Sequence, residues 1–176
     1  MKTGGYGIEI RVTGCELRVS GWVALIFNPN LKAGDKLMTV QISQIMVQTT
    51  GKTDIIDVTH QVMGEVGKSN VQDGAATLFI PGSTAALTTI EFESGAINDL
   101  KKAIEKMAPE DIYYEHNERW GDGNGYSHVR AAIFGASLHI PIVEGKMTLG
   151  TWQQIVLLDF DNRPRERSIV IQISGE

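Results

Sequence analysis

Imidazole, carboxylate and amide side chains lie close together in one short segment of the sequence. His116 and His128 flank Asp122 and Asn124, which belong to the glycine-rich run GDGNG. These groups could form a metal site or an acid/base centre, because imidazole titrates near neutral pH and all of them can ligate a cation. The spacing matches no standard zinc pattern; imidazole suits zinc, whereas carboxylate and amide oxygens suit magnesium or manganese. The residue types leave the metal open, together with a plain structural role in which both histidines donate hydrogen bonds to loop carbonyls.

A second candidate site is the loop PGSTAA, which follows a predicted strand. The main-chain N–H groups and hydroxyls of Gly82, Ser83 and Thr84 could hold phosphate oxygens. No lysine lies nearby in the sequence, so an ordinary turn between strands is the simpler interpretation.

Arginines that could bind an anion occur in two places. Arg130 follows His128 by two positions on the same short predicted helix. The other place is DFDNRPRER, where an anion site would require the arginines to converge, and a solvated hairpin tip with neutralised charges is the simpler interpretation. The arginines are Arg163, Arg165 and Arg167, and the neighbouring acids are Asp159, Asp161 and Glu166.

Local patterns predict the elements that would position these groups. Alternating residues predict short strands between residues 7 and 27, and strands at 39–49 and 54–59 joined as a hairpin through TGKT. Helical spacing predicts a helix that Thr59 caps, an amphipathic helix from Ser94 to Pro109, and a helix at 126–134 between Asn124 and Gly135. Further strands are predicted for ATLFIP, ALTTIEF, SLHIPIV, KMTLGTWQQIVLLDF and RSIVIQIS. Strands outnumber helices, so the expected fold class is α+β with mainly antiparallel sheets.

The composition limits the classes of function. The chain has 176 residues, of which 42% are hydrophobic, and this favours one globular domain. A net charge of −5 without a basic stripe argues against a nucleic-acid partner. Cys15 is the single cysteine, so an intramolecular disulfide or a cysteine-based zinc site is excluded and a cytoplasmic location is expected. Neither a membrane span nor a signal peptide is predicted.

Four ordered blocks carry a resemblance to a known family, although no Walker loop, dinucleotide fingerprint, zinc-protease motif or serine elbow is present. The blocks are IPGSTAALTTIEFE, YYEHN, GDGNGYSHVRAAIFGASL and IPIVEGKMTLGTWQQIVLLDFDNRPRERSIVIQISGE. In them the chain closely resembles the YjbQ-like family, also called secondary thiamine-phosphate synthases. The run DGNGYSHVRA resembles the archaeal-type branch, whereas bacterial members carry an acidic-acidic-Met-Pro-Ala-His run there.

The resemblance implies a compact α+β subunit with a two-sheet β-sandwich, assembled as a homotrimer with a polar cleft near the subunit contact. Bacterial members have a histidine where this chain has Gly82, so a three-histidine metal site would be incomplete here. The residue types and the resemblance together give these candidates: catalytic residues His116, His128 and Glu91; metal ligands His116, His128 and Asp122; and substrate or phosphate contacts Gly82, Ser83, Thr84, Gly123, Asn124, Arg130, Thr151, Trp152 and Gln153.

Two segments are distinguished along the chain. Residues 38–176 correspond to the YjbQ-like domain, and residues 1–37 form an N-terminal extension without a counterpart in the family. The alternating pattern of this extension favours a genuine extra strand pair. The linker NPNLKAGDK, which Met38 follows closely, favours a natural start at that methionine instead.

Three functions fit the expected site. The first is a secondary thiamine-phosphate synthase that joins hydroxymethylpyrimidine diphosphate to thiazole phosphate and releases diphosphate, assisted by a divalent ion such as magnesium, manganese or zinc. The second is a metal- or histidine-dependent hydrolase of another small phosphorylated metabolite. The third is a trimeric small-ligand or metal-binding protein without catalysis.

Overall fold

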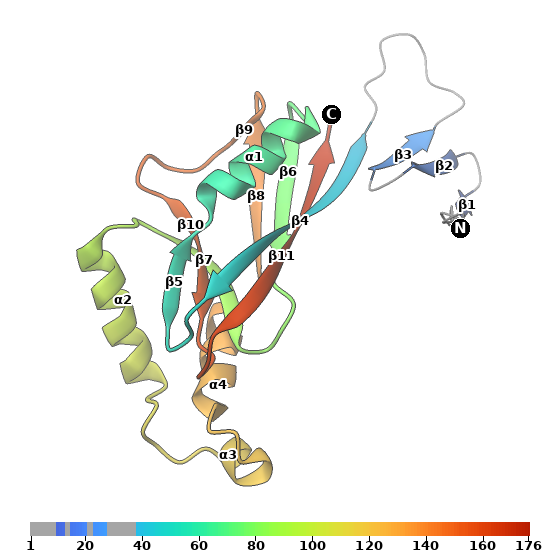
Figure 1. The fold of residues 1–176 in the computed structure, drawn as a ribbon. Helices are drawn as coiled ribbons and strands as arrows, with labels where there is room; N and C mark the ends of the chain where they lie inside the picture. Colours follow the sequence, from blue (N-terminus) through green and yellow to red (C-terminus); the bar gives the residue numbers. More distant parts are fainter. Residues whose placement is uncertain (1–9, 13–14, 21–22, 28–37) are drawn as a thin grey trace.

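The chain folds into a mixed α/β structure with antiparallel sheets, and the computed structural model describes residues 10–12, 15–20, 23–27 and 38–176 (Figure 1). In the larger sheet the strand order is β1 (Ile10–Val12), β2 (Cys15–Ser20), β3 (Val23–Phe27), β4 (Thr39–Thr49), β11 (Arg165–Gly175), β6 (Gly74–Phe79), β8 (Ser137–Val143) and β9 (Lys146–Met147). In the smaller sheet the order is β5 (Asp54–Asp57), β10 (Gln154–Asp159) and β7 (Ala85–Ile90). The helices are α1 (Thr59–Ser69), α2 (Ser94–Met107), α3 (Glu115–Trp120) and α4 (Gly125–Phe134).

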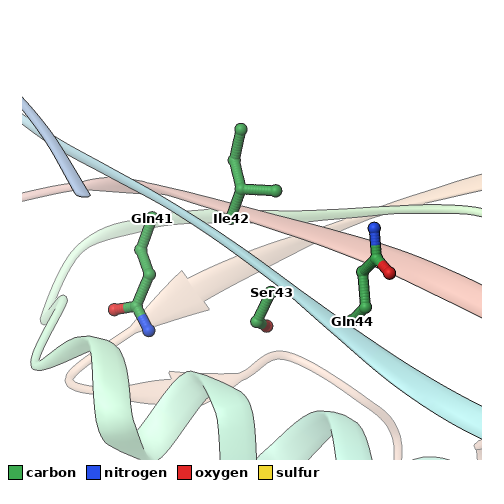
Figure 2. Close-up of a pocket in the computed structure, with 4 residues that line it drawn as sticks. All are labelled: Gln41, Ile42, Ser43 and Gln44. Carbon is green, nitrogen blue, oxygen red and sulfur yellow. The ribbon is translucent and has the colours of Figure 1, made fainter. Parts of the chain in front are cut away.

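The long antiparallel pair of β4 and β11 runs through the middle of the larger sheet, from the pairing of Arg165 with Thr49 to that of Gly175 with Thr39. Side chains alternate along β4 as the strand pleat requires. Figure 2 shows Gln41 and Ser43 pointing toward helix α1, and Ile42 pointing away from it, beside a pocket of about 360 Å³. The strand predicted at residues 39–49 is confirmed.

Two apolar clusters hold the elements together. The first takes residues from both sheets and from α1, including Leu78, Leu157 and Ile171. The second packs the other side of the smaller sheet, through Val156 and Leu158, against Ile104 of α2 and Ala131 of α4. The smaller sheet is therefore buried on both faces, which explains why β10 reads as a continuous apolar run.

The predicted hairpin between β4 and β5 is wrong, because the two strands belong to different sheets. Gly51, Lys52 and Thr53 all have positive φ angles, of 76°, 56° and 62°, and this turn leads the chain from the larger sheet to the smaller one. The N–H of Lys52 donates to the main-chain oxygen of Asp161 at 2.7 Å. A Cβ at residue 51 would lie only 2.6 Å from that same oxygen, so the turn requires glycine.

Helix ends also differ from the sequence-based expectation. Val58, rather than Thr59, is the N-cap of α1, and Asp57 Oδ1 accepts from the main-chain N–H of Thr59 at 2.8 Å. The hydroxyl of Thr59 is available for β10 and accepts from the N–H of Ile155 at 2.9 Å. The helices predicted from Ser94 and up to Phe134 are confirmed, whereas α3 was not predicted because its six residues are too few to show a periodic pattern.

Candidate functional site

A cleft of about 410 Å³ opens where the two sheets meet the short helices α3 and α4. The loop between β6 and β7 forms one side, because these consecutive strands lie in different sheets and the loop crosses between them. The turn between β10 and β11 forms another side, because these consecutive strands also lie in different sheets. The residues that line the cleft are Gly82, Ser83, Thr84, His116, Trp120, Asp122, Asn124, His128, Asp161, Arg165 and Arg167.

The two histidine rings are in contact within this cleft. His116 lies on α3 and His128 on α4, and their ring centroids are 4.3 Å apart. His116 Nε2 lies 3.5 Å from Asp122 Oδ2. With its amide oriented to satisfy both ends, Asn124 donates to Asp122 Oδ1 at 3.1 Å and to His116 Nε2 at 3.2 Å. Asn124 is the N-cap of α4 by position, but its buried side chain makes no capping hydrogen bond and instead links Asp122 to His116.

The surroundings of His128 favour its neutral form. Burial lowers the pKa of the His128 imidazole, and the neighbouring His116 lowers it further. Asp122 and Asp161 act in the opposite direction, as does a hydrogen bond with the main chain of Ser83, but they do not outweigh burial. A neutral imidazole near pH 7 is able to accept a proton, which suits a general base.

Two arginines of β11, Arg165 and Arg167, also line the cleft. Arg167 Nη2 donates to Asp159 Oδ1 at 2.6 Å and to the hydroxyl of Thr84 at 2.8 Å. Arg165 Nε donates to Asp161 Oδ2 at 2.9 Å, and this oxygen also accepts from Thr84 at 2.9 Å. The arginines therefore converge on the cleft, and the solvated hairpin tip favoured by the sequence is wrong for this part of the segment.

The acidic residues of the same segment neutralise the arginines, as expected, but they do so in the interior. Asp159 and Asp161 are 0% and 1% exposed. Burial alone would raise the pKa of Asp159, but hydrogen bonds from Arg167 and Thr49 outweigh burial and hold that pKa below its ordinary value. The spacing of Arg165 and Arg167 could have indicated that the two side chains lie together, since residues two apart share one face of a strand.

Several candidates from the sequence lie outside the cleft. Arg130 is 2% exposed and donates to Ala108 O, Thr53 Oγ1 and Glu105 Oε2, which corrects its prediction as a phosphate contact because the guanidinium is held by the protein itself. Glu91 follows the far end of β7, about 20 Å along the strand from Thr84. Gly123 adjoins the cleft through its two neighbours but does not line it.

The residues of the GTWQ motif gather at a different place. Thr151 and Gln153 line a separate pocket of about 350 Å³ that also includes Met63 of α1. Trp152 is 70% exposed next to this pocket. The geometry therefore separates the GTWQ motif from the two histidines, which the resemblance had placed in one site.

The proposed metal ligands meet at the cleft without forming a complete cation site. His116 and Asp122 are neighbours, but within the described part of the chain no group of three or more His, Cys, Asp or Glu side chains is placed to hold a metal ion. The protein groups alone do not fit a resident zinc site, which needs at least three protein ligands.

Comparison with known proteins assigns the chain to a class with this fold. A structure of a YbjQ-like protein of unknown function from Sulfolobus solfataricus P2 superimposes with a TM-score of 0.76 at 34% identity, over 79% of this chain and 99% of that one. A hypothetical protein from Aeropyrum pernix K1 gives a TM-score of 0.72 at 29% identity, over 77% of this chain and 99% of that one. The class is therefore the mixed α/β, antiparallel-sheet proteins typified by these structures.

Sequence similarity then identifies the family. The model of the family described as UPF0047 protein YjbQ-like matches residues 43–176, and the chain belongs to this family. A UPF0047 protein of Methanothermobacter thermautotrophicus is 34% identical over 139 residues, which are 79% of this chain and 95% of the relative. The UPF0047 protein YugU of Bacillus subtilis is 32% identical over 135 residues, 76% of this chain and 99% of the relative. The resemblance found in the sequence is confirmed.

Proposed function

We propose that the cleft is an active site that acts on small phosphorylated metabolites, with thiamine-phosphate synthesis as a secondary activity. The observation that carries the proposal is that two contacting imidazoles and two arginine side chains line one cleft. Imidazoles can move protons, and guanidinium groups bind phosphate oxygens. An enzyme that displaces diphosphate needs both abilities in one place.

The proposed reaction makes one bond and breaks one bond. The ring nitrogen of thiazole phosphate forms a bond to the methylene carbon of hydroxymethylpyrimidine diphosphate, while the bond from that carbon to the diphosphate oxygen breaks. The departing diphosphate keeps the bonding electron pair, so negative charge develops on its oxygens. Stabilising that charge is the largest task for the site, and fixed donors are the means to do so.

The side chains are proposed to share this task by position. Arg165 and Arg167, together with Ser83 and Thr84, would donate to the diphosphate oxygens. His116 would give a proton to the departing diphosphate, and its Nε2 lies beside the amide of Asn124 and the carboxylate of Asp122. The neutral His128 would contact the reacting group without adding a second positive charge.

A divalent ion remains part of the proposal, and magnesium, manganese and zinc are its candidates. Magnesium is often bound by only one or two carboxylates together with substrate phosphates, and it retains water. A cation brought in by the diphosphate would therefore suit a site whose own ligands are incomplete. None of the residue roles proposed above depends on the ion.

The finer features of the assembly belong to the same proposal. We expect the two sheets to form the family's sandwich and the subunit to form a homotrimer, with the cleft close to the subunit contact. We also expect a cytoplasmic protein with no nucleic-acid or membrane partner. In support, no helix in the described part of the chain is long and apolar enough to cross a membrane.

Hydrolysis of another phosphorylated metabolite is the second candidate function. It is favoured by the exposure of Asp122, whose side chain is 44% exposed and leaves water with access to the histidine pair. Binding of a small ligand without catalysis would use the same contacts. The synthase differs from both alternatives because it needs two organic substrates at once.

The deciding experiment incubates the protein with both phosphorylated precursors and magnesium, manganese or zinc, and detects thiamine phosphate by mass spectrometry. We expect weak formation that requires the cation, falls at least tenfold in His128→Ala, and falls in Ser83→Ala and Thr84→Val. His139→Ala is the matched control, since this exposed histidine of β8 interacts with Thr77 outside the cleft. Equal product from the wild type and His128→Ala would refute the synthase assignment.

A further inference from the structure

Arg167 has an unused donor at the cleft. Its Nε donates to Asp159 Oδ2 at 2.8 Å, and its Nη2 donates to Asp159 and Thr84. Its Nη1 donates to no residue in the described part of the chain, although Arg167 is only 9% exposed. In the described part of the chain, the side-chain atoms that are buried without a hydrogen-bond partner do not include this nitrogen, so it is accessible to water or to a ligand.

Gly82 is the residue that leaves this nitrogen accessible. A Cβ at Gly82 would lie 3.5 Å from Arg167 Nη1, so any larger side chain would begin in contact with the guanidinium. Gly82 has a φ angle of 125°, which residues with a side chain rarely adopt. The loop therefore presents main chain, rather than a side chain, in front of Arg167.

The acidic partners of the two arginines hold them in place, and one partner, Asp161, also lines the cleft. Asp159 and Asp161 are buried and fix the guanidinium groups through hydrogen bonds. Arg165 keeps a side chain that is 34% exposed. Donors that are held in place by such hydrogen bonds lose little freedom when a ligand binds.

We infer that Arg165, Arg167 and the main chain at Gly82 form a metal-independent subsite for a phosphate-type oxyanion. The subsite takes a terminal phosphate or diphosphate group and orients the remainder of the ligand toward the histidine pair. The location rests on the proposed function, but oxyanion binding does not require the synthase reaction. Asp122 is the exposed carboxylate of the cleft and opposes the anion by repulsion.

The test titrates inorganic pyrophosphate into the full-length protein by isothermal titration calorimetry, with EDTA present to remove metal ions. Wild type binds, and Arg165→Gln binds at least tenfold more weakly, because a charge-assisted hydrogen bond is lost. Arg163→Gln is the matched control, because this exposed arginine of the turn between β10 and β11 does not line the cleft. Its variant keeps the wild-type affinity within about twofold. Gly82→Val also binds at least tenfold more weakly, while circular dichroism confirms that each variant is folded.

Asp122→Asn separates this inference from the proposed function. Removal of the opposing carboxylate strengthens pyrophosphate binding in EDTA, whereas loss of thiamine-phosphate formation in the same variant concerns the reaction alone. Absence of pyrophosphate binding by wild type, equal binding by Arg165→Gln and Arg163→Gln, or weaker binding by Asp122→Asn would overturn the subsite. Failure of the synthase assay would leave it intact.

Discussion

At the scale of single residues, the contact between His116 and His128 determines how the cleft responds to protons. Two imidazolium rings with centroids 4.3 Å apart would repel each other, so adding a second positive charge is unfavourable. Burial already lowers the pKa of His128. The pair therefore combines a neutral ring at neutral pH with a neighbour that has both an amide and a carboxylate beside it.

The lowered pKa of His128 predicts a pH-dependent stability. An unfolded histidine has a pKa of about 6.5 and binds a proton more readily than native His128, so acid favours the unfolded chain. The contribution of His128 is complete above the unfolded pKa and decreases as the pH falls through about 6.5. We expect the melting temperature of wild type to drop between about pH 7.5 and about pH 5.5, and to drop less in His128→Asn.

Thermal unfolding followed by circular dichroism across this range measures the difference. His139→Asn serves as the control, because His139 is exposed on β8 and should leave the wild-type slope unchanged. Parallel curves for wild type and His128→Asn would contradict the explanation.

At the scale of elements, the turn between β10 and β11 fixes one wall of the cleft. The two strands belong to different sheets, and this turn, which contains Asp161, leads the chain from the smaller sheet to the larger one. The buried pair of Arg167 and Asp159 lies at the root of that turn. The rigidity of the wall therefore depends on an ion pair in the interior.

Removing one member of this pair should destabilise the protein strongly. Arg167→Ala leaves Asp159 buried without its cation, and such losses amount to about 3–5 kcal/mol in the free energy of unfolding. Arg163→Ala changes an exposed residue of the turn between β10 and β11, and its free energy of unfolding should stay within about 0.5 kcal/mol of the wild-type value. Urea denaturation of both variants tests the comparison, and similar losses in the two would argue against a structural ion pair.

The elements also indicate how far the sequence predicted the structure. Most strands and the long helices were predicted correctly because their periodic patterns report burial on one face or both, as in β4 and α2. The single strand predicted for KMTLGTWQQIVLLDF is wrong, because this segment forms β9 and β10, which belong to different sheets. The pairing of β4 with β5 was predicted incorrectly, because a short loop with glycine resembles a hairpin even when its strands enter different sheets.

The structure brings some of the predicted site residues together and separates others. His116, His128, Asp122 and the loop of Ser83 lie around one cleft, as their residue types suggested. Arg130 was misjudged because proximity along a helix does not specify which face a side chain occupies. The roles of Arg165 and Arg167 depend on contacts between distant segments, which the local sequence does not contain.

At the scale of the whole molecule, exposed apolar side chains on the larger sheet suggest how subunits assemble. Ile42 and Met46 of β4, Phe79 of β6 and Val143 of β8 are between 38% and 56% exposed. Exposed apolar side chains gathered on a sheet are frequently covered by another chain. We expect light scattering coupled to size-exclusion chromatography to give the mass of a trimer, and a stable monomer at micromolar concentration would contradict it.

A shortened chain tests the contribution of the first segment. β3 extends the larger sheet by pairing with Thr39, Val40 and Gln41 of β4. The family match begins at residue 43, and β11 pairs with the whole of β4 from its other side. We therefore expect a chain that begins at Met38 to fold and to keep pyrophosphate binding, as measured by calorimetry. Aggregation of this chain beside a soluble full-length protein would show that residues 1–37 belong to the structural core.

The glycine turn between the sheets has a consequence for experiments that replace every residue in turn. Gly51 lies against the main-chain oxygens of Asp161 and Arg163, at 2.6 and 2.7 Å from the place where a Cβ would stand. Any substitution there would displace the turn between β10 and β11, which leads to both cleft arginines, although residue 51 does not line the cleft. A saturation library scored for ligand binding would thus mark position 51 as intolerant. A map of mutational tolerance for this protein would overstate the extent of its binding surface, unless each loss of binding is paired with a measurement of folded protein.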